Sequence, residues 1–322
     1  MPENWCFPIT LMTRSERICA RAMKGSAAWG VRLRDDACAK MAGLFAREGR
    51  MSRQKVTEFF DQNVGDYQSK HYGGSVRTFM TVRLEAVLRN VDRLSLSRGA
   101  KVLDAGCGPG ALVEALARRE LWVSGLDVSE NMLARTAERM ESLGEAYPVS
   151  LKQGSIDSLP YSDDSFDLVC STGVIEYLDT DQLVLQEMYR VLRPGGFLLI
   201  SVTNAWSPVN SLDFIVEFLK RRHMFLRCFN RIWTRLGKEP VLPRSFRVRR
   251  HRPSRFRKSL RQAGFEVLAA EFFHFMPWPR PLDKFFPKAT TRLGDKLEQL
   301  CKTNLAFLGE GYLVVCTKQK SR

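Results

Sequence analysis

A loop with three glycines follows a short apolar run in the sequence VLDAGCGPGA, which spans residues 102–111. Such a loop lets the backbone approach a ligand closely at the C-terminal edge of a parallel sheet. Asp104 lies two residues before the first glycine, Gly106, and Asp127 lies 21 residues after it. A carboxylate at this spacing can accept hydrogen bonds from both hydroxyls of a ribose. The pattern therefore predicts a site for a nucleoside.

The order Gly106-x-Gly108-x-x-Ala111 also satisfies the fingerprint of dinucleotide-binding loops, so a nicotinamide cofactor is an alternative. Two residues disfavour it. Pro109 has no N–H group to donate to an anionic pyrophosphate, and the Asp104 carboxylate would repel one. A ligand with an ammonium group, a sulfonium group and no phosphate fits this loop better. S-adenosylmethionine (SAM) has these properties.

Two further segments extend the pattern. In residues 154–169, Ile156 offers an apolar surface for adenine, and Asp157 can accept a hydrogen bond from its amino group. The sequence VLRPGGFLLI follows at residues 191–200. With the glycine loop and the acidic strand end, these segments resemble the class I SAM-dependent methyltransferases, in particular the group that includes the ubiquinone and menaquinone biosynthesis enzymes. The resemblance covers residues 55–204.

This resemblance implies a Rossmann-like α/β fold: a doubly wound, mostly parallel sheet of seven strands, with the last strand antiparallel. It also implies SAM as the cofactor. The contacts that it implies come from the glycine loop, the ends of the second and fourth strands and the segment after the third: Asp104, Gly106, Cys107, Gly108, Asp127, Val128, Met132, Ile156, Asp157, Ser171, Thr172 and Gly173.

Alternating strands and helices must position these residues. Two helical patterns between residues 56 and 94 predict a helical N-terminal extension, and near-continuous apolar runs predict buried parallel strands after it. The helices between the strands must then cover both faces of the sheet. The expected strands are residues 101–106, 121–127, 148–154, 166–172 and 197–203, one strand after the helix that starts at Pro253, and a last strand at 311–318.

Residues 1–50 have weak periodicity and contain no residues that suggest chemistry. We expect a poorly patterned extension, either a disordered tail or a segment upstream of a natural start at Met51. Residues 51–322 are then the methyltransferase domain, with residues 205–262 as an insert between strands 5 and 6.

The formal net charge of +15 is concentrated in this insert, which holds 16 Lys or Arg and 3 Asp or Glu. In residues 212–236, a helical wheel separates a half rich in Phe and Trp from a basic half. This pattern predicts a basic amphipathic helix. Three interpretations remain open: a membrane-surface element that reaches a lipid-soluble acceptor, an RNA-binding face, or a cap whose charges are merely solvated. We favour the first.

Methyl transfer from a sulfonium is an in-line displacement, and it needs a general base only if the nucleophile must lose a proton. His71, Tyr72, Tyr177 and His251 are weak candidates, since a lone histidine is more often structural. Many members of the family carry Glu-His where this chain has Glu176 followed by tyrosine, so a histidine base is not expected there. No Asn/Asp-Pro-Pro-aromatic motif follows the fourth strand, which disfavours methylation of nucleic-acid bases.

The sequence therefore predicts a SAM-dependent methyltransferase for a small-molecule or lipid-like acceptor. An RNA methyltransferase, or a protein with this fold but no catalytic activity, is the alternative. The eight cysteines form no CxxC pair and no metal-ligand spacing, so we expect no metal and a reduced, cytoplasmic protein. No apolar run is long enough for a membrane span, and attachment to an anionic membrane would be peripheral, on the inner face.

Overall fold

The computed structural model describes residues 53–62, 78–144, 147–212, 223–235, 237, 248–278 and 287–319. The chain divides into two units, Met1–Arg50 and Met51–Arg322, and every described residue belongs to the second. The expectation for residues 1–50 lies outside the described residues. So do the candidates His71 and Tyr72.

Seven strands form one sheet in the order β3-β2-β1-β4-β5-β7-β6, and β7 runs antiparallel to both of its neighbours. This confirms the predicted seven-stranded, mostly parallel fold. The crossover at β1 places the ends of β1, β2 and β4 side by side, where parallel α/β sheets bind ligands. The strands are β1 (Lys101–Ala105), β2 (Trp122–Asp127), β3 (Val149–Gln153), β4 (Phe166–Thr172), β5 (Leu192–Thr203), β6 (Phe265–Phe273) and β7 (Gly311–Lys318).

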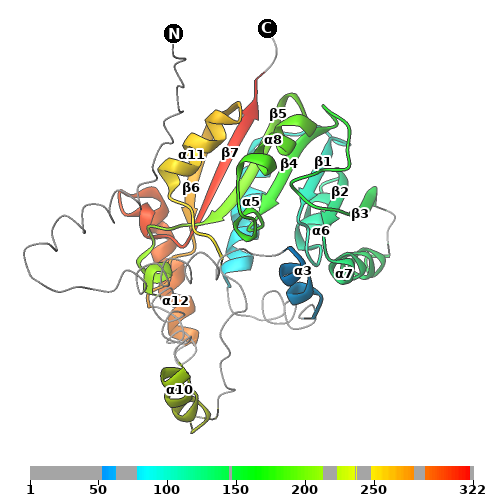
Figure 1. The fold of residues 1–322 in the computed structure, drawn as a ribbon. Coiled ribbons are helices and arrows are strands. Elements are labelled where there is room, and N and C mark those ends of the chain that lie inside the picture. The colour runs from blue at the N-terminus through cyan, green and yellow to red at the C-terminus, as the bar shows by residue number, and fades with distance from the viewer. Residues whose placement is uncertain are drawn as a thin grey trace, which may run out of the picture. The chain divides into compact units, whose positions relative to one another are not determined.

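Helices cover the two faces of this sheet (Figure 1). On one face lie α5 (Phe79–Arg93), α6 (Ala111–Ala117) and α7 (Glu130–Glu141), and on the other lie α8 (Gln182–Val191) and α11 (Pro253–Gln262). Their buried side chains are mainly aliphatic. The two apolar cores hold the strands in register. The polar residues at the C-terminal ends of the parallel strands therefore lie along one edge of the sheet.

Of the remaining elements, one precedes this core along the chain and the others lie in connections between its strands and helices. They are α3 (Arg53–Gln62), the 3-10 helix η1 (Ile175–Tyr177), α10 (His223–Arg235), α12 (Pro287–Leu297), and the 3-10 helices η3 (Glu298–Lys302) and η4 (Ala306–Leu308). With α5, α3 provides the expected helical N-terminal extension. None of the described helices is long and apolar enough to cross a membrane.

The start of β5 differs from the expectation. The sequence predicts a strand at 197–203, but β5 already begins at Leu192 and includes Arg193-Pro194-Gly195-Gly196. The pairing of β4 with β5 is irregular here: Phe166 pairs with Leu192, and Leu168 pairs with Phe197. The Pro-Gly-Gly sequence therefore forms an irregularity within the strand rather than a separate turn.

The structure describes parts of the basic insert. The amphipathic helix expected at 212–236 corresponds to α10, His223–Arg235, and residues 213–222 and 236 lie outside the described residues. The insert ends in α11, whose Phe256 and Leu260 are buried against the sheet.

Deleting residues 1–50 is expected to leave the melting temperature and the SAM affinity unchanged. The core and the glycine loop are built entirely from residues of the second unit. Thermal unfolding and calorimetric titration of the full chain and of a chain that starts at Met51 would check this. A fall of several degrees in the melting temperature would mean that the segment is part of the fold.

Candidate cofactor and acceptor pocket

The glycine loop joins the end of β1 to the end of β2. The N–H groups of Gly106 and Cys107 donate to the Leu126 carbonyl at 2.7 and 3.0 Å, and the Gly108 N–H donates to Asp127 Oδ2 at 2.9 Å. Gly106 and Gly108 have φ values of +88° and +52°, which side chains disfavour. A Cβ atom at Gly106 would also lie 2.4 Å from Val174 Cγ2, so this position requires glycine.

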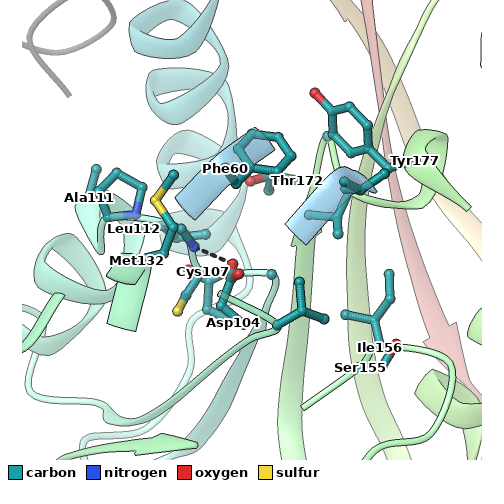
Figure 2. Close-up of a pocket in the computed structure, with 18 of the residues that line it drawn as sticks. Phe60, Asp104, Cys107, Ala111, Leu112, Met132, Ser155, Ile156, Thr172 and Tyr177 are labelled. Atoms are coloured by element: carbon teal, nitrogen blue, oxygen red, sulfur yellow. Dashed lines mark hydrogen bonds between the residues drawn. The ribbon is translucent and has the colours of Figure 1, made fainter. Parts of the chain in front are cut away.

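One pocket lies above this loop, and Figure 2 shows residues of several elements that face it. Ten of the twelve expected contact residues line it: Asp104, Gly106, Cys107, Gly108, Asp127, Val128, Met132, Ile156, Thr172 and Gly173. The pocket extends beyond them to α3, α5 and η1. Further lining residues include Val56, Phe60, Arg83, Leu84, Val87, Ser155, Val174, Tyr177 and Leu178.

The other two expected contacts, Asp157 and Ser171, do not line the pocket. Asp157 Oδ1 accepts a hydrogen bond from Ser155 Oγ at 2.6 Å. Ser171 is buried, and its Oγ donates to the Ala105 carbonyl at 3.0 Å, so it connects β4 to β1. The side chain of Ser155, which the sequence argument passed over, reaches the pocket instead.

Asp104 is a buried acid whose carboxylate has no hydrogen-bond partner among the described residues. The residue is 1% exposed, and both of its carboxylate oxygens are unpaired there, although it lines the pocket. Burial, and then the nearby Asp127, raise the pKa of Asp104 to about 7, while Arg83 opposes the rise. An unpaired buried carboxylate is costly, so it marks a place where a cationic ligand group can bind.

Asp127 organises the neighbouring strand end. Its Oδ2 accepts the Gly108 N–H, and its Oδ1 accepts the Ser129 N–H at 3.0 Å. Burial raises the pKa of this carboxyl group, and these N–H groups oppose the rise. Each oxygen keeps a second lone pair for a ligand hydroxyl. Ser129 is the N-cap of α7, since its Oγ accepts the Met132 N–H at 3.1 Å.

Sequence reasoning missed Arg83, the cation of this pocket. It lies on α5, is 7% exposed, and its guanidinium packs so closely on Gly173 that a Cβ there would lie 1.9 Å from Nη1. The pocket therefore contains a fixed guanidinium as well as carboxylates. Its position on the buried side of the amphipathic helix α5 could have identified Arg83 in the sequence. Charged residues are seldom buried unless they bind a partner or a ligand.

Helix α3 forms another part of the pocket wall. Phe60 packs edge-to-face on Tyr177, with ring centroids 5.3 Å apart, and both residues line the pocket (Figure 2). At the end of α3, Asp61 accepts a hydrogen bond from Ser129 Oγ, and its carbonyl accepts one from Asn131 Nδ2 at 3.3 Å. Tyr177, the weak catalytic candidate on η1, is thus part of the pocket.

His251 lies elsewhere. It is 7% exposed, does not line the pocket, and its Nε2 lies 3.1 Å from Asp181 Oδ1. This placement does not favour the direct catalytic role considered for it. Across the described residues, no group of His, Cys, Asp or Glu is arranged to hold a metal ion.

Comparison with known proteins agrees with this geometry. Residues 103–200 match the family described as "Methyltransferase domain", which spans the glycine loop and the strand ends around the pocket. This chain carries a class I SAM-dependent methyltransferase domain.

Relatives of this methyltransferase domain are found among bacterial and fungal proteins. Methyltransferase GfsG of Streptomyces halstedii is 36% identical over 170 residues, which cover 47% of this chain and 61% of GfsG. O-methyltransferase resE of Aspergillus sclerotiorum is 29% identical over 249 residues, which cover 74% of this chain and 84% of resE. Four relatives are 31 to 39% identical to this chain in the matched regions. The match covers only 24 to 61% of the length of each of these relatives.

The fold itself is similar to that of the [4+2]-cyclase SpnF, with a TM-score of 0.54 and 20% identity; the match covers 83% of this chain and 96% of SpnF. This similarity concerns the fold alone, because one fold can support different chemistries.

SAM, the cofactor of this family, fits the methyltransferase pocket. The Asp104 carboxylate has both oxygens available for an ammonium group, and Arg83 offers a guanidinium for a carboxylate. Asp127 can accept hydrogen bonds from the ribose hydroxyl groups, and Ile156 and Met132 offer apolar surfaces for the adenine. A Cβ atom at Gly108 would meet no other atom within 4 Å, so the backbone at this point is open to a ligand.

The pKa of Asp104 predicts how SAM affinity depends on pH. Below pH 7 this carboxyl group takes up a proton and loses the charge that attracts the ammonium group. We therefore expect SAM to bind about tenfold more weakly for each pH unit below 7. The SAM-free protein should show the opposite trend. Since the folded pKa lies above the usual 3.8, the folded state binds more protons, and its stability rises as pH falls toward 4.

Calorimetric titration and thermal unfolding between pH 5.5 and 8 would measure both trends. The matched control is Asp104→Asn, which keeps the shape of the side chain and removes its titration. The wild-type protein should lose affinity toward low pH, and the variant should bind weakly at every pH. If the two proteins had parallel pH curves, the assignment of Asp104 would be wrong.

Proposed function

We propose that this protein transfers the methyl group of SAM to a small apolar or lipid-like acceptor, and that it does so at an anionic membrane surface. The observation that carries the methyl-transfer proposal is the buried, unpaired Asp104 beside Asp127 and Arg83. These groups match the ammonium, ribose and carboxylate of SAM, and a phosphate-containing cofactor would meet two carboxylates.

The acceptor end of the pocket is apolar. Val56 and Phe60 of α3, and Tyr177 and Leu178 around η1, line it far along the chain from the glycine loop. Such a wall excludes water and favours an apolar acceptor over a highly charged one. We infer that the acceptor places its nucleophilic atom among these side chains.

The transfer forms one bond from the acceptor's lone pair to the methyl carbon and breaks the bond from that carbon to sulfur. The electron pair of the broken bond stays on sulfur and cancels its positive charge. Asp104, Asp127 and Arg83 hold the donor, while Phe60 and Tyr177 hold the acceptor in line and keep water out. Burial holds the pKa of the Cys107 thiol well above its usual value, so it is not suited to act as a base.

No histidine lines the pocket among the residues that the structure describes. An acceptor with an ionised oxygen, or with a free lone pair on nitrogen, would need no base from those residues. The relative resE is an O-methyltransferase, and we favour an oxygen acceptor such as a carboxylate or phenolate.

The surface cations support the proposed membrane docking. In α11 and just before it, Arg252, Arg255, Lys258 and Arg261 are exposed, and no ion pair is found for them within the described part of the chain. On α10, Arg227, Arg231 and Arg235 are also exposed. Each such cation near an anionic surface contributes about 1 kcal/mol.

Exposed apolar side chains lie next to the start of the insert. Trp206 and Phe307 are 45% and 40% exposed. Asn204 joins their backbones, because its Oδ1 accepts the Trp206 N–H at 2.9 Å and its Nδ2 donates to the Phe307 carbonyl at 2.8 Å. Cations together with exposed aromatic side chains are typical of surfaces that enter the lipid headgroup region.

Methyl transfer would be tested with labelled SAM and a total lipid and metabolite extract. The wild-type protein is expected to label an apolar product and to release S-adenosylhomocysteine in equal amount, while Asp104→Ala reduces both by at least tenfold because it loses the ammonium partner. Tight SAM binding with no methylated product from lipids, metabolites or RNA would contradict the enzymatic proposal. A labelled RNA product would show a different acceptor class.

Membrane docking would be tested by co-sedimentation with phosphatidylcholine vesicles, with and without phosphatidylserine. We expect binding only to the anionic vesicles, and loss of binding at high salt. The double substitution Arg255→Glu and Lys258→Glu should weaken binding by at least tenfold. The control Arg118→Glu and Arg135→Glu makes the same change of charge just after α6 and on α7, and it should have a smaller effect. Protein that stays in the supernatant with anionic vesicles at low salt would refute the docking.

A further inference from the structure

Two separate parts of the basic insert, its first residue Ala205 and His251 just before α11, meet beside the end of β5. The Ala205 N–H donates to the His251 carbonyl at 2.9 Å, and the His251 N–H donates to the Thr203 carbonyl at 2.9 Å. A bridge between Asn204 and His251 extends the sheet pattern by one residue. We call these contacts the base of the insert, and they give residues 249–251 a defined position next to β5.

From this base, Arg249 contacts η1. Its N–H donates to the Glu176 carbonyl at 3.0 Å, and its Nη2 donates to the Ile175 carbonyl at 2.9 Å. The same Nη2 also donates to the Asp181 carboxylate, which lies just after η1. One arginine thus bonds two consecutive carbonyls of η1 and the acid at the N-terminus of α8.

Neighbouring groups fix this arrangement. Glu176 is buried, and its Oε2 accepts the Thr203 N–H at 2.7 Å. Asp181 also bonds His251 Nε2. Burial alone would raise the pKa of Asp181, but His251 and Arg249 lower it below its usual value, so this acid stays charged. The hydrogen bond from Arg249 Nη2 to Asp181 then joins opposite charges, which makes it strong.

The 3-10 helix η1 depends on such external partners. Its own backbone bonds are few: Tyr177 N–H to Val174 O at 3.0 Å and Leu178 N–H to Ile175 O at 3.2 Å. One turn of this kind has little intrinsic stability. Yet it positions three pocket residues, Val174, Tyr177 and Leu178, and Val174 packs directly on Gly106 of the glycine loop.

We propose that Arg249 is a positioning residue, which holds η1 against the pocket and so ties the geometry of the methyl-transfer site to the base of the basic insert. Arg249 does not line the pocket and acts through Tyr177 and Val174. The expected effect on turnover rests on the function proposed above. The effect on the position of η1 does not, because it follows from the contacts alone.

The experiment compares Arg249→Ala with the matched control Arg190→Ala in the full-length protein. Arg190 also braces a loop from the α8 side: its guanidinium donates to the carbonyls of Tyr161 and Leu159 at 2.7 and 3.0 Å, and it pairs with Glu187. Both variants lose an arginine that joins carbonyls to a carboxylate. Only the first should affect η1. Amide hydrogen exchange, S-adenosylhomocysteine binding and acceptor kinetics are measured for both.

In Arg249→Ala, we expect exchange at the Tyr177 and Leu178 amides to rise at least tenfold while exchange in β1 and β4 is unchanged. We also expect S-adenosylhomocysteine to bind several-fold more weakly and the acceptor KM to rise more than kcat falls. Arg249→Lys keeps the charge but not the forked geometry, so it should restore wild-type exchange and binding only in part. Arg190→Ala should leave exchange at Tyr177 and Leu178 as in the wild-type protein.

The proposal is overturned if the Tyr177 and Leu178 amides of Arg249→Ala exchange as in the wild-type protein. It is also overturned if exchange across the whole sheet rises by the same factor as at these two amides. If Arg249→Ala does not fold, the same criteria apply to Arg249→Lys and to Asp181→Asn. If the wild-type protein methylates no acceptor, the proposed function fails. The exchange and S-adenosylhomocysteine measurements then still decide whether Arg249 positions η1.

Discussion

The hydrogen bond from the Gly108 N–H to the Asp127 carboxylate connects the two strand ends on which the pocket is built. The N–H groups of Gly106 and Cys107 reinforce it through the Leu126 carbonyl. Because the same carboxylate also binds the Ser129 N–H, it fixes the loop after β1 and the start of α7 together. The fold around the pocket can therefore keep one shape before a cofactor arrives, which reduces the entropy lost on binding.

The apolar cores of the sheet make this polar site possible. Asp104 lies on β1 between buried aliphatic residues, where its unpaired carboxylate is destabilising for the cofactor-free protein. That cost is tolerable because two large apolar clusters stabilise the sheet on both faces. The same burial strengthens the attraction between Asp104 and a cationic ligand, since there is little water to screen it. Stability given up in the free protein thus increases affinity for the donor.

Local patterns predicted the parts of this protein that depend on local sequence. The buried strands appear as apolar runs and the glycine loop as a short motif, so these elements lie close to where they were predicted, apart from the earlier start of β5. Asp157 and Ser171 do not line the pocket: Asp157 is bonded to Ser155, and Ser171 Oγ to the Ala105 carbonyl. A local pattern does not show on which side of a strand or loop a single side chain lies. Arg83 and Arg249 could not be placed, because their partners Gly173 and Ile175 lie 90 and 74 residues away along the chain.

The contacts of Arg249 also suggest why a family of this fold can change acceptors without losing its cofactor. The donor side rests on β1 and β2 and on bonds within the first half of the sheet, none of which involves the insert. The proposed acceptor side rests on η1, which is braced by Arg249 at the base of the insert. Changes in the length or charge of the insert can therefore reach Tyr177 through Arg249, while the hydrogen bonds of Asp127 remain and the donor side is affected only through the contact of Val174 with Gly106. This arrangement would let the proposed membrane surface and the proposed acceptor pocket change together, because both depend on the same base beside β5.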